Sequence, residues 1–125
     1  MNPIDALFQR LRAQGRKAFI PFLTAGDPDL SGTMLLCKEL ARHGASLIEL
    51  GFPYSDPIAD GPVIQASYTR ALNKGIRIED IFASVASFDD RTNVVVRTAS
   101  STSVCGSFAA FMSACRALFS LSSCR

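Results

Sequence analysis

Three carboxylates lie close together in the first half of the chain, and their types and spacing could support proton transfer. The stretch reads LIELGFPYSDPIADGP, from Leu47 to Pro62, and its carboxylates are Glu49, Asp56 and Asp60. A glutamate inside an apolar run is costly to bury unless its charge is paired or used. Two carboxylates in different surroundings, one in an apolar wall and one in a polar loop, can divide the roles of acid and base.

Each carboxylate also has a structural interpretation. Glu49 could pair with an arginine or lysine of a neighbouring strand, and its position alone favours neither interpretation. Asp56 precedes a proline, where an aspartate commonly bonds the backbone of its own turn. Asp60 precedes Gly61 and could cap the next helix. Catalysis by Asp60 is favoured only if Glu49 faces the same site.

The elements that would position these residues alternate between helical and strand patterns. In chain order, the predicted elements are a helix from Ile4 to about Gly15, a strand at 18–24, a helix at 27–44, a strand at 46–50, helices at 61–74 and 78–88, and a strand that starts at 94–96. Asp27 is the predicted cap of the second helix, with Pro28 in its first turn. This alternation argues for parallel strands with crossover helices.

Two folds share this alternation, the open doubly wound sheet and the closed (β/α)₈ barrel. The open sheet would be favoured by a GxGxxG turn after the first strand, but TAGDPDLSG contains only isolated glycines. The barrel is favoured because Glu49 is near the carboxyl end of its strand and Asp60 follows, where barrels place their chemistry. With period-two alternation, Glu49 and Gly51 face the barrel mouth while Ile48 and Leu50 pack against helices. The chain's 125 residues are well short of the about 250 that such a barrel uses.

Composition excludes several classes of function. The net charge of +2 is too small to argue for binding of nucleic acid. The apolar run near the C-terminus is too short to span a membrane. The N-terminus lacks the uninterrupted apolar core of a secretion signal, so a cytoplasmic protein is expected. Four cysteines without paired spacing and a single histidine predict no metal site. Cys37 is interpreted as a packed, reduced thiol and His43 as a residue at a helix C-terminus.

Two segments carry a resemblance to a known family. PFLTAGDPD, at 21–29, and LIELGFPYSDPIADGPVIQASYTRAL, at 47–72, closely resemble the alpha subunit of tryptophan synthase, in the right order and separation. That family is a (β/α)₈ barrel that cleaves indole-3-glycerol phosphate to indole and glyceraldehyde 3-phosphate during tryptophan biosynthesis. It passes indole to a beta subunit that holds pyridoxal phosphate. The resemblance therefore implies a lyase with a beta-subunit partner and no cofactor in this chain.

The resemblance also implies roles for individual residues. Glu49 matches the family's acid/base carboxylate, and Asp60 matches its second catalytic carboxylate. Phe22, on the first predicted strand, matches a residue that lines the indole pocket and so binds substrate. The loop from 53 to 60 matches one that also contacts the beta subunit, which implies interface roles for Pro53 and Asp56.

Beyond Val96 the resemblance ends. The remaining segment, RTASSTSVCGSFAAFMSACRALFSLSSCR, is rich in serine, alanine and cysteine and contains no acidic residue. The sequence therefore divides into a partial barrel at 1–96, truncated after about the third strand, and a divergent tail at 97–125. An out-of-frame continuation of a family reading frame would produce such a tail. Because the family's phosphate-binding loops are missing, the alternative to a lyase is a truncated, non-catalytic remnant that at most contacts the beta subunit.

Overall fold

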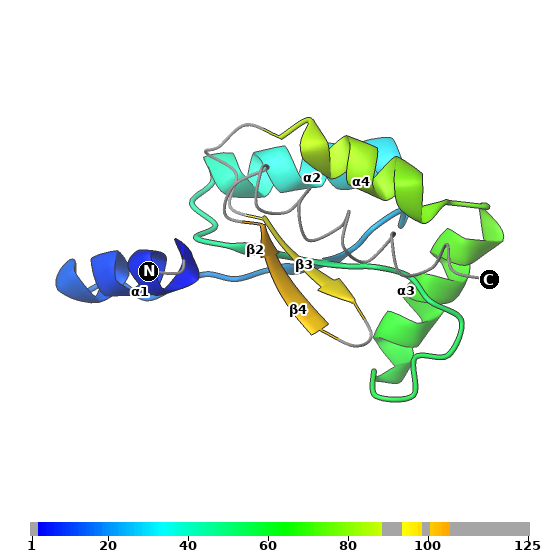
Figure 1. The fold of residues 1–125 in the computed structure, drawn as a ribbon, viewed down its shortest axis with the longest axis horizontal. Helices are drawn as coiled ribbons and strands as arrows, with labels where there is room; N and C mark the ends of the chain where they lie inside the picture. Colours follow the sequence, from blue (N-terminus) through cyan, green and yellow to red (C-terminus); the bar gives the residue numbers. More distant parts are fainter. Residues whose placement is uncertain (1–2, 89–93, 99–100, 106–125) are drawn as a thin grey trace, which may run out of the picture.

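The computed structural model describes residues 3–88, 94–98 and 101–105, which form helices around a four-stranded sheet (Figure 1). In chain order the elements are α1 (Pro3–Ala13), β1 (Phe22–Thr24), α2 (Leu30–Arg42), β2 (Ile48–Gly51), α3 (Pro62–Asn73), α4 (Ile78–Ala86), β3 (Val94–Thr98) and β4 (Ser101–Cys105). The predicted order of helices and strands from the N-terminus to the third strand is confirmed. Only the last three residues of the strand predicted at 18–24 have strand structure.

The sheet has the strand order β1-β2-β3-β4, and its first three strands are parallel. The parallel register places Phe22 opposite Glu49 and Glu49 opposite Val95. Figure 1 shows α2 and α4 side by side over one face of this sheet, while α1 and α3 lie toward opposite sides of the molecule. The parallel strands with crossover helices agree with the predicted alternation.

The fourth strand is antiparallel to β3, an arrangement that the sequence analysis did not predict. If β4 were parallel to β3, the two strands would need a crossover connection of a dozen or more residues, which is usually a helix. Here only two residues separate Thr98 from Ser101, and a connection of that length fits a hairpin. The outer edge of β3 is therefore paired with β4.

The core lies between the sheet and the pair α2 and α4. Its buried members come from β2, the segments after β1 and β2, α2 and α4: Ala25, Cys37, Ile48, Leu50, Phe52, Ile81 and Val85. The ring of Phe52 meets the ring of Phe82 edge to face, with 4.9 Å between centroids. Ile48 and Leu50 are thus on the helix-facing side of β2, as the alternation predicted.

The start of α2 differs from the prediction. The N-cap is Asp29, whose carboxylate accepts a hydrogen bond of 2.6 Å from the backbone N–H of Gly32. Asp27 instead contacts α3, and Pro28 precedes the cap rather than lying in the first turn. The reason is the turn at Gly26, where φ is +89° and the chain needs two more residues before it enters the helix. His43 is the C-cap residue of α2, as predicted.

Cys37 on α2 is fully buried and reduced, as its sequence context predicted. Burial raises the pKa of its thiol to about 11, so the reactive thiolate is scarce near neutral pH. We expect the folded protein to resist alkylation of Cys37 by iodoacetamide at mildly alkaline pH, and expect rapid reaction in urea. Mass spectrometry of the peptide that contains Cys37 measures both rates. Equal rates in the two conditions would show that Cys37 is not protected by the fold.

None of the helices within the described ranges is long and apolar enough to cross a membrane.

Candidate functional site

The predicted site residues Phe22 and Glu49 are neighbours across the β1–β2 ladder. They are paired in register, and paired residues of parallel strands project from the same face of the sheet. Both side chains are half-buried, whereas Ile48 and Leu50, on the other face of β2, are almost fully buried. The sheet therefore brings the predicted indole-contacting ring and the predicted acid/base carboxylate to one face.

Gly51 allows two aromatic side chains to approach the end of β2. A Cβ atom on Gly51 would lie 2.5 Å from Cζ of Phe22 and 2.8 Å from the hydroxyl oxygen of Tyr68. Both distances are far below ordinary contact, so only glycine fits between these side chains. Tyr68 comes from α3 and is only 2% exposed. Sequence reasoning missed it, although its spacing from Ile64 and Ala71 placed it on the apolar face of that helix.

Asp60 does not cap α3. The N-cap residue is Gly61, which makes no side-chain capping bond, and the helix begins with Pro62 at its first position. The Tyr54 hydroxyl donates a hydrogen bond of 3.0 Å to Oδ2 of Asp60. The ring of Tyr54 also contacts the ring of Tyr68, with 5.3 Å between centroids. The carboxylate is thus linked to α3 through two tyrosines.

The loop from β2 to α3 is held by the amide of Gln65 as well. Its Nε2 donates to the backbone carbonyl of Asp60 at 2.7 Å and to that of Pro57 at 3.1 Å. The backbone N–H of Ile58 donates to the carbonyl of Asp56 at 2.9 Å. These bonds fix the loop backbone at Asp60 and in the residues before it.

The two predicted interface residues have different surroundings. Asp56 is exposed, whereas Pro53 is buried. Two apolar side chains of the same region are strongly exposed, Ile58 at 83% and Val63 at 80%. Ile58 lies in the proline-rich loop, whereas Val63 lies in the first turn of α3. Sequence reasoning did not identify either as an exposed contact residue, although an apolar residue within a proline-rich loop was a signal for one.

The loop after β1 is attached to the same helix. The hydroxyls of Thr24 and Ser67 lie 2.6 Å apart in a buried hydrogen bond. Arg70 donates from Nε and Nη2 to the two carboxylate oxygens of Asp27, at 3.1 and 2.6 Å. Lys74 donates to the carbonyl of Pro28. Helix α3 therefore positions both loops that follow the carboxyl ends of β1 and β2.

The ion pair with Arg70 lowers the pKa of Asp27, chiefly through the side-chain hydrogen bond. The pair therefore stabilises the fold above the ordinary carboxyl pKa of 3.8, and this contribution is lost as the pH falls below 3.8 through the folded pKa. We expect Asp27→Asn to lower the free energy of unfolding at neutral pH, and expect its difference from wild type to shrink below 3.8. Urea unfolding across this pH series measures the difference.

Asp5→Asn, which removes an exposed carboxylate from α1, is the control for the Asp27 variant, and we expect it to change stability little. A difference between wild type and Asp27→Asn that stays constant through the acid range would contradict a role for this ion pair.

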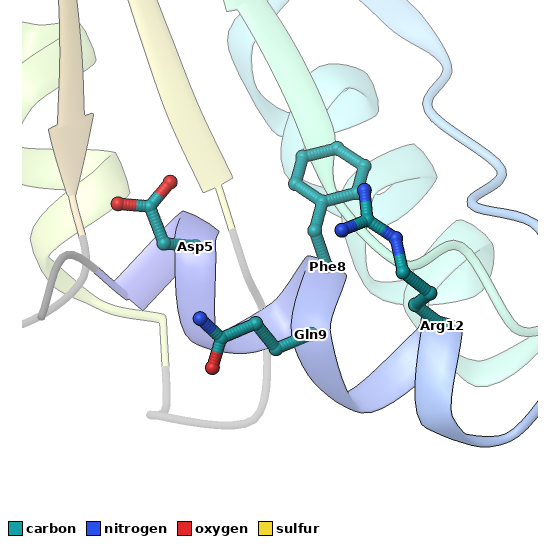
Figure 2. Close-up of a pocket in the computed structure, with 4 residues that line it drawn as sticks. All are labelled: Asp5, Phe8, Gln9 and Arg12. Atoms are coloured by element: carbon teal, nitrogen blue, oxygen red, sulfur yellow. The ribbon is translucent and has the colours of Figure 1, made fainter.

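A depression of about 380 Å³ lies along α1, lined by Asp5, Phe8, Gln9 and Arg12. Figure 2 shows these four side chains, which come from successive turns of the one helix. Neither Glu49 nor Asp60 belongs to it, so this depression is separate from the predicted catalytic pair. Within the ranges that the structure describes, no group of three or more histidine, cysteine or carboxylate side chains could hold a metal ion.

The chain is similar in sequence to a known protein family. The family model for the tryptophan synthase alpha chain matches residues 8–100. The tryptophan synthase alpha chain of Synechocystis is 60% identical over 85 residues, which cover 68% of this chain and 32% of that protein. The chain thus spans about a third of the length of this curated relative.

Solved structures give the same result. The tryptophan synthase subunit alpha of Legionella pneumophila is 41% identical with a TM-score of 0.71, and the match covers 77% of this chain and 38% of that one. A structure of the tryptophan synthase a2b2 complex of Pyrococcus furiosus matches at 44% identity with a TM-score of 0.58, over 63% of this chain and 34% of that one.

These matches confirm the predicted fold class, an α/β structure with parallel strands that corresponds to the N-terminal part of a (β/α)₈ barrel. The match to the family model covers most of the chain, and the relatives are similar in both sequence and structure. The chain belongs to the tryptophan synthase alpha chain family.

Proposed function

We propose that the described residues form the N-terminal part of a lyase site that cleaves indole-3-glycerol phosphate to indole and glyceraldehyde 3-phosphate in L-tryptophan biosynthesis. The observation that carries the proposal is the register of β1 and β2, which brings Phe22 and Glu49 to one face of the sheet. Asp60 follows β2 and is held by Tyr54 against α3. Membership of the tryptophan synthase alpha chain family supports this choice of reaction.

The proposed reaction is a retro-aldol cleavage that needs two proton transfers. Glu49 serves both transfers: it protonates C3 of the indole, so that the ring accepts the electrons of the breaking bond. The resulting Glu49 carboxylate then accepts the proton of the glycerol hydroxyl that becomes the aldehyde. Asp60, as a carboxylate, accepts the indole N–H and stabilises the positive charge that grows there. Phe22 contacts the indole ring. The chain itself uses no cofactor in this proposal.

The proposed partner is a tryptophan synthase beta subunit, which would hold pyridoxal phosphate. Asp56 and Ile58 in the loop after β2 and Val63 at the start of α3 are exposed, and exposed apolar side chains such as Ile58 and Val63 would contact the partner. Buried Pro53 would stiffen the loop from inside rather than touch the partner. The matched Pyrococcus furiosus structure is of an a2b2 complex, which supports this assembly. The proposal places the protein in the cytoplasm.

The alternative is a non-catalytic remnant that at most contacts a beta subunit. Its supporting observation is that the chain spans only 32% of the Synechocystis relative, so most of that protein's barrel has no counterpart here. Indole release from indole-3-glycerol phosphate by the purified 125-residue chain, with and without the Synechocystis beta subunit, tests whether the chain alone is a lyase. We expect no measurable release in either assay. Release that Glu49→Gln abolishes would show that the chain alone is a lyase.

The site itself is tested in a protein with a complete barrel. In this joined protein, residues 1–88 of the chain replace the matching N-terminal residues of the Synechocystis tryptophan synthase alpha chain. The proposal predicts indole release by the joined protein and a large loss of turnover in its Asp60→Asn variant. A joined protein that is folded and active, and whose turnover does not depend on Asp60, would contradict the role given to this residue.

A further inference from the structure

We propose that Tyr54 is the positioning residue of Asp60: its hydroxyl holds the Asp60 carboxylate in one rotamer, the orientation in which that carboxylate accepts an N–H of an aromatic ligand. The inference rests on the proposed function for the identity of that ligand. The positioning itself rests on contacts of the described residues.

The hydrogen bond from Tyr54 to Oδ2 of Asp60 is 3.0 Å long and partly buried. A hydroxyl that donates to a carboxylate makes a charge-assisted, directional hydrogen bond, and this one is at the long end of the usual O–H···O range. Partial burial reduces the competition from water. The bond therefore favours the orientation of the Asp60 side chain in which Oδ2 faces the Tyr54 hydroxyl.

Tyr54 can restrain Asp60 only if Tyr54 is itself held in place. Its ring lies against the ring of Tyr68, at 5.3 Å between centroids and an interplanar angle of 51°. Tyr68 is 2% exposed on α3, and its hydroxyl oxygen lies 2.8 Å from where a Cβ on Gly51 would be. A continuous series of contacts therefore runs from the end of β2, through the two tyrosine rings, to the Asp60 carboxylate.

The backbone and the side chain of Asp60 are held by different groups. Gln65 from α3 bonds the carbonyls of Pro57 and Asp60, so the loop backbone does not depend on the Tyr54 hydroxyl. Tyr54→Phe keeps the ring on Tyr68 and removes only the donor. This substitution isolates the positioning of the carboxylate from the folding of the loop.

The test uses the isotope-labelled 125-residue chain without substrate. Three-bond couplings between Hα and Hβ of Asp60 report its χ1 rotamer in solution. We expect wild type to show one dominant rotamer and Tyr54→Phe to show averaged couplings. Ser55→Ala, an exposed neighbour in the same loop, is the control and should match wild type. Averaged couplings in wild type, or one unchanged rotamer in folded Tyr54→Phe, would overturn the inference.

A second measurement covers the case in which Tyr54→Phe does not fold. The exchange rate of the Tyr54 hydroxyl proton in wild type is read from the deuterium isotope shift of its Cζ resonance. A hydroxyl bonded to Asp60 should exchange more slowly than that of a solvent-exposed tyrosine. Exchange as fast as that of the exposed reference would overturn the inference.

The two proposals fail in different experiments. The couplings and the exchange rate are measured in the resting chain, so they do not require turnover. If both agree with positioning while Asp60→Asn leaves turnover of the joined protein unchanged, then Asp60 is not catalytic and Tyr54 still positions it. If turnover depends on Asp60 but the couplings are averaged, then the catalytic role stands and positioning by Tyr54 fails.

Discussion

Replacing Glu49 by glutamine in the joined protein is expected to lower kcat for indole release by about 10²–10⁴-fold. Glutamine keeps the size of the side chain and can donate a hydrogen bond, but it cannot give and take a proton at neutral pH. The loss should appear in kcat with a smaller change in KM, because proton transfer acts on the transition state rather than on substrate binding. Steady-state assays of indole release measure both constants.

The structural interpretation of Glu49, a carboxylate that only pairs with a neighbouring cation, predicts a different result for the same variant. Stability would fall while kcat of the folded protein stayed within a few-fold of wild type. Measuring the free energy of unfolding beside kcat therefore separates the two interpretations. Glu39→Gln on α2 is the matched control, because it removes a carboxylate that pairs with Arg42 at the surface, and it should leave kcat unchanged.

Replacing Gly51 by alanine is expected to destabilise the 125-residue chain by about 1–3 kcal/mol, the usual range for overpacking a filled interior. The added Cβ would lie 2.5 Å from the Phe22 ring and 2.8 Å from the Tyr68 hydroxyl oxygen. Tyr68 is 2% exposed and has little room to move, so the Phe22 ring is the group that must shift. Urea unfolding followed by circular dichroism measures the loss.

Gly61→Ala is the control for the Gly51 variant. No atom lies within 4 Å of a Cβ at Gly61, and φ there is −71°, which any residue can adopt. We expect a much smaller loss of stability, limited to the weaker preference for alanine at an N-cap. Equal losses in the two variants would show that the close approach of Phe22 and Tyr68 to β2 does not matter for stability.

The features that the sequence predicted well are those that depend on local patterns. Alternation along β2 predicted that Ile48 and Leu50 would be buried against helices, and the structure buries both almost completely. The helix predicted at 61–74 is α3, with Gly61 as its N-cap and Pro62 at its first position. These features need only the period of a strand or the chemistry of one helix terminus.

The features that the sequence could not supply depend on loop conformation. Asp27 and Asp29 flank the same proline, so the sequence pattern did not distinguish which of them is the N-cap. In the structure the chain turns at Gly26, and α2 begins after Asp29, which is the N-cap. Asp60 was expected either to cap α3 or to act in the site, and its bond from Tyr54 depends on how the intervening residues fold. That Phe22 lies opposite Glu49 could be predicted only from the register of β1 and β2, which the sequence pattern does not give.

The antiparallel β4 shows a similar limit. Its hairpin with β3 depends on pairing between residues on either side of a two-residue connection, in a segment whose composition suggested no particular element. The resemblance to the family ended at Val96, so it offered no guide to this strand.

Indole release by the wild-type joined protein is the measurement that tests the account most directly. Its first 88 residues come from this chain, so activity requires Phe22, Glu49 and Asp60 to work in a complete barrel. We predict a kcat within about tenfold of the parent Synechocystis alpha chain, a change of no more than about 1.4 kcal/mol in the activation barrier. A joined protein that has the circular dichroism spectrum of the parent but releases no indole would contradict the proposal that this chain carries the N-terminal part of a lyase site.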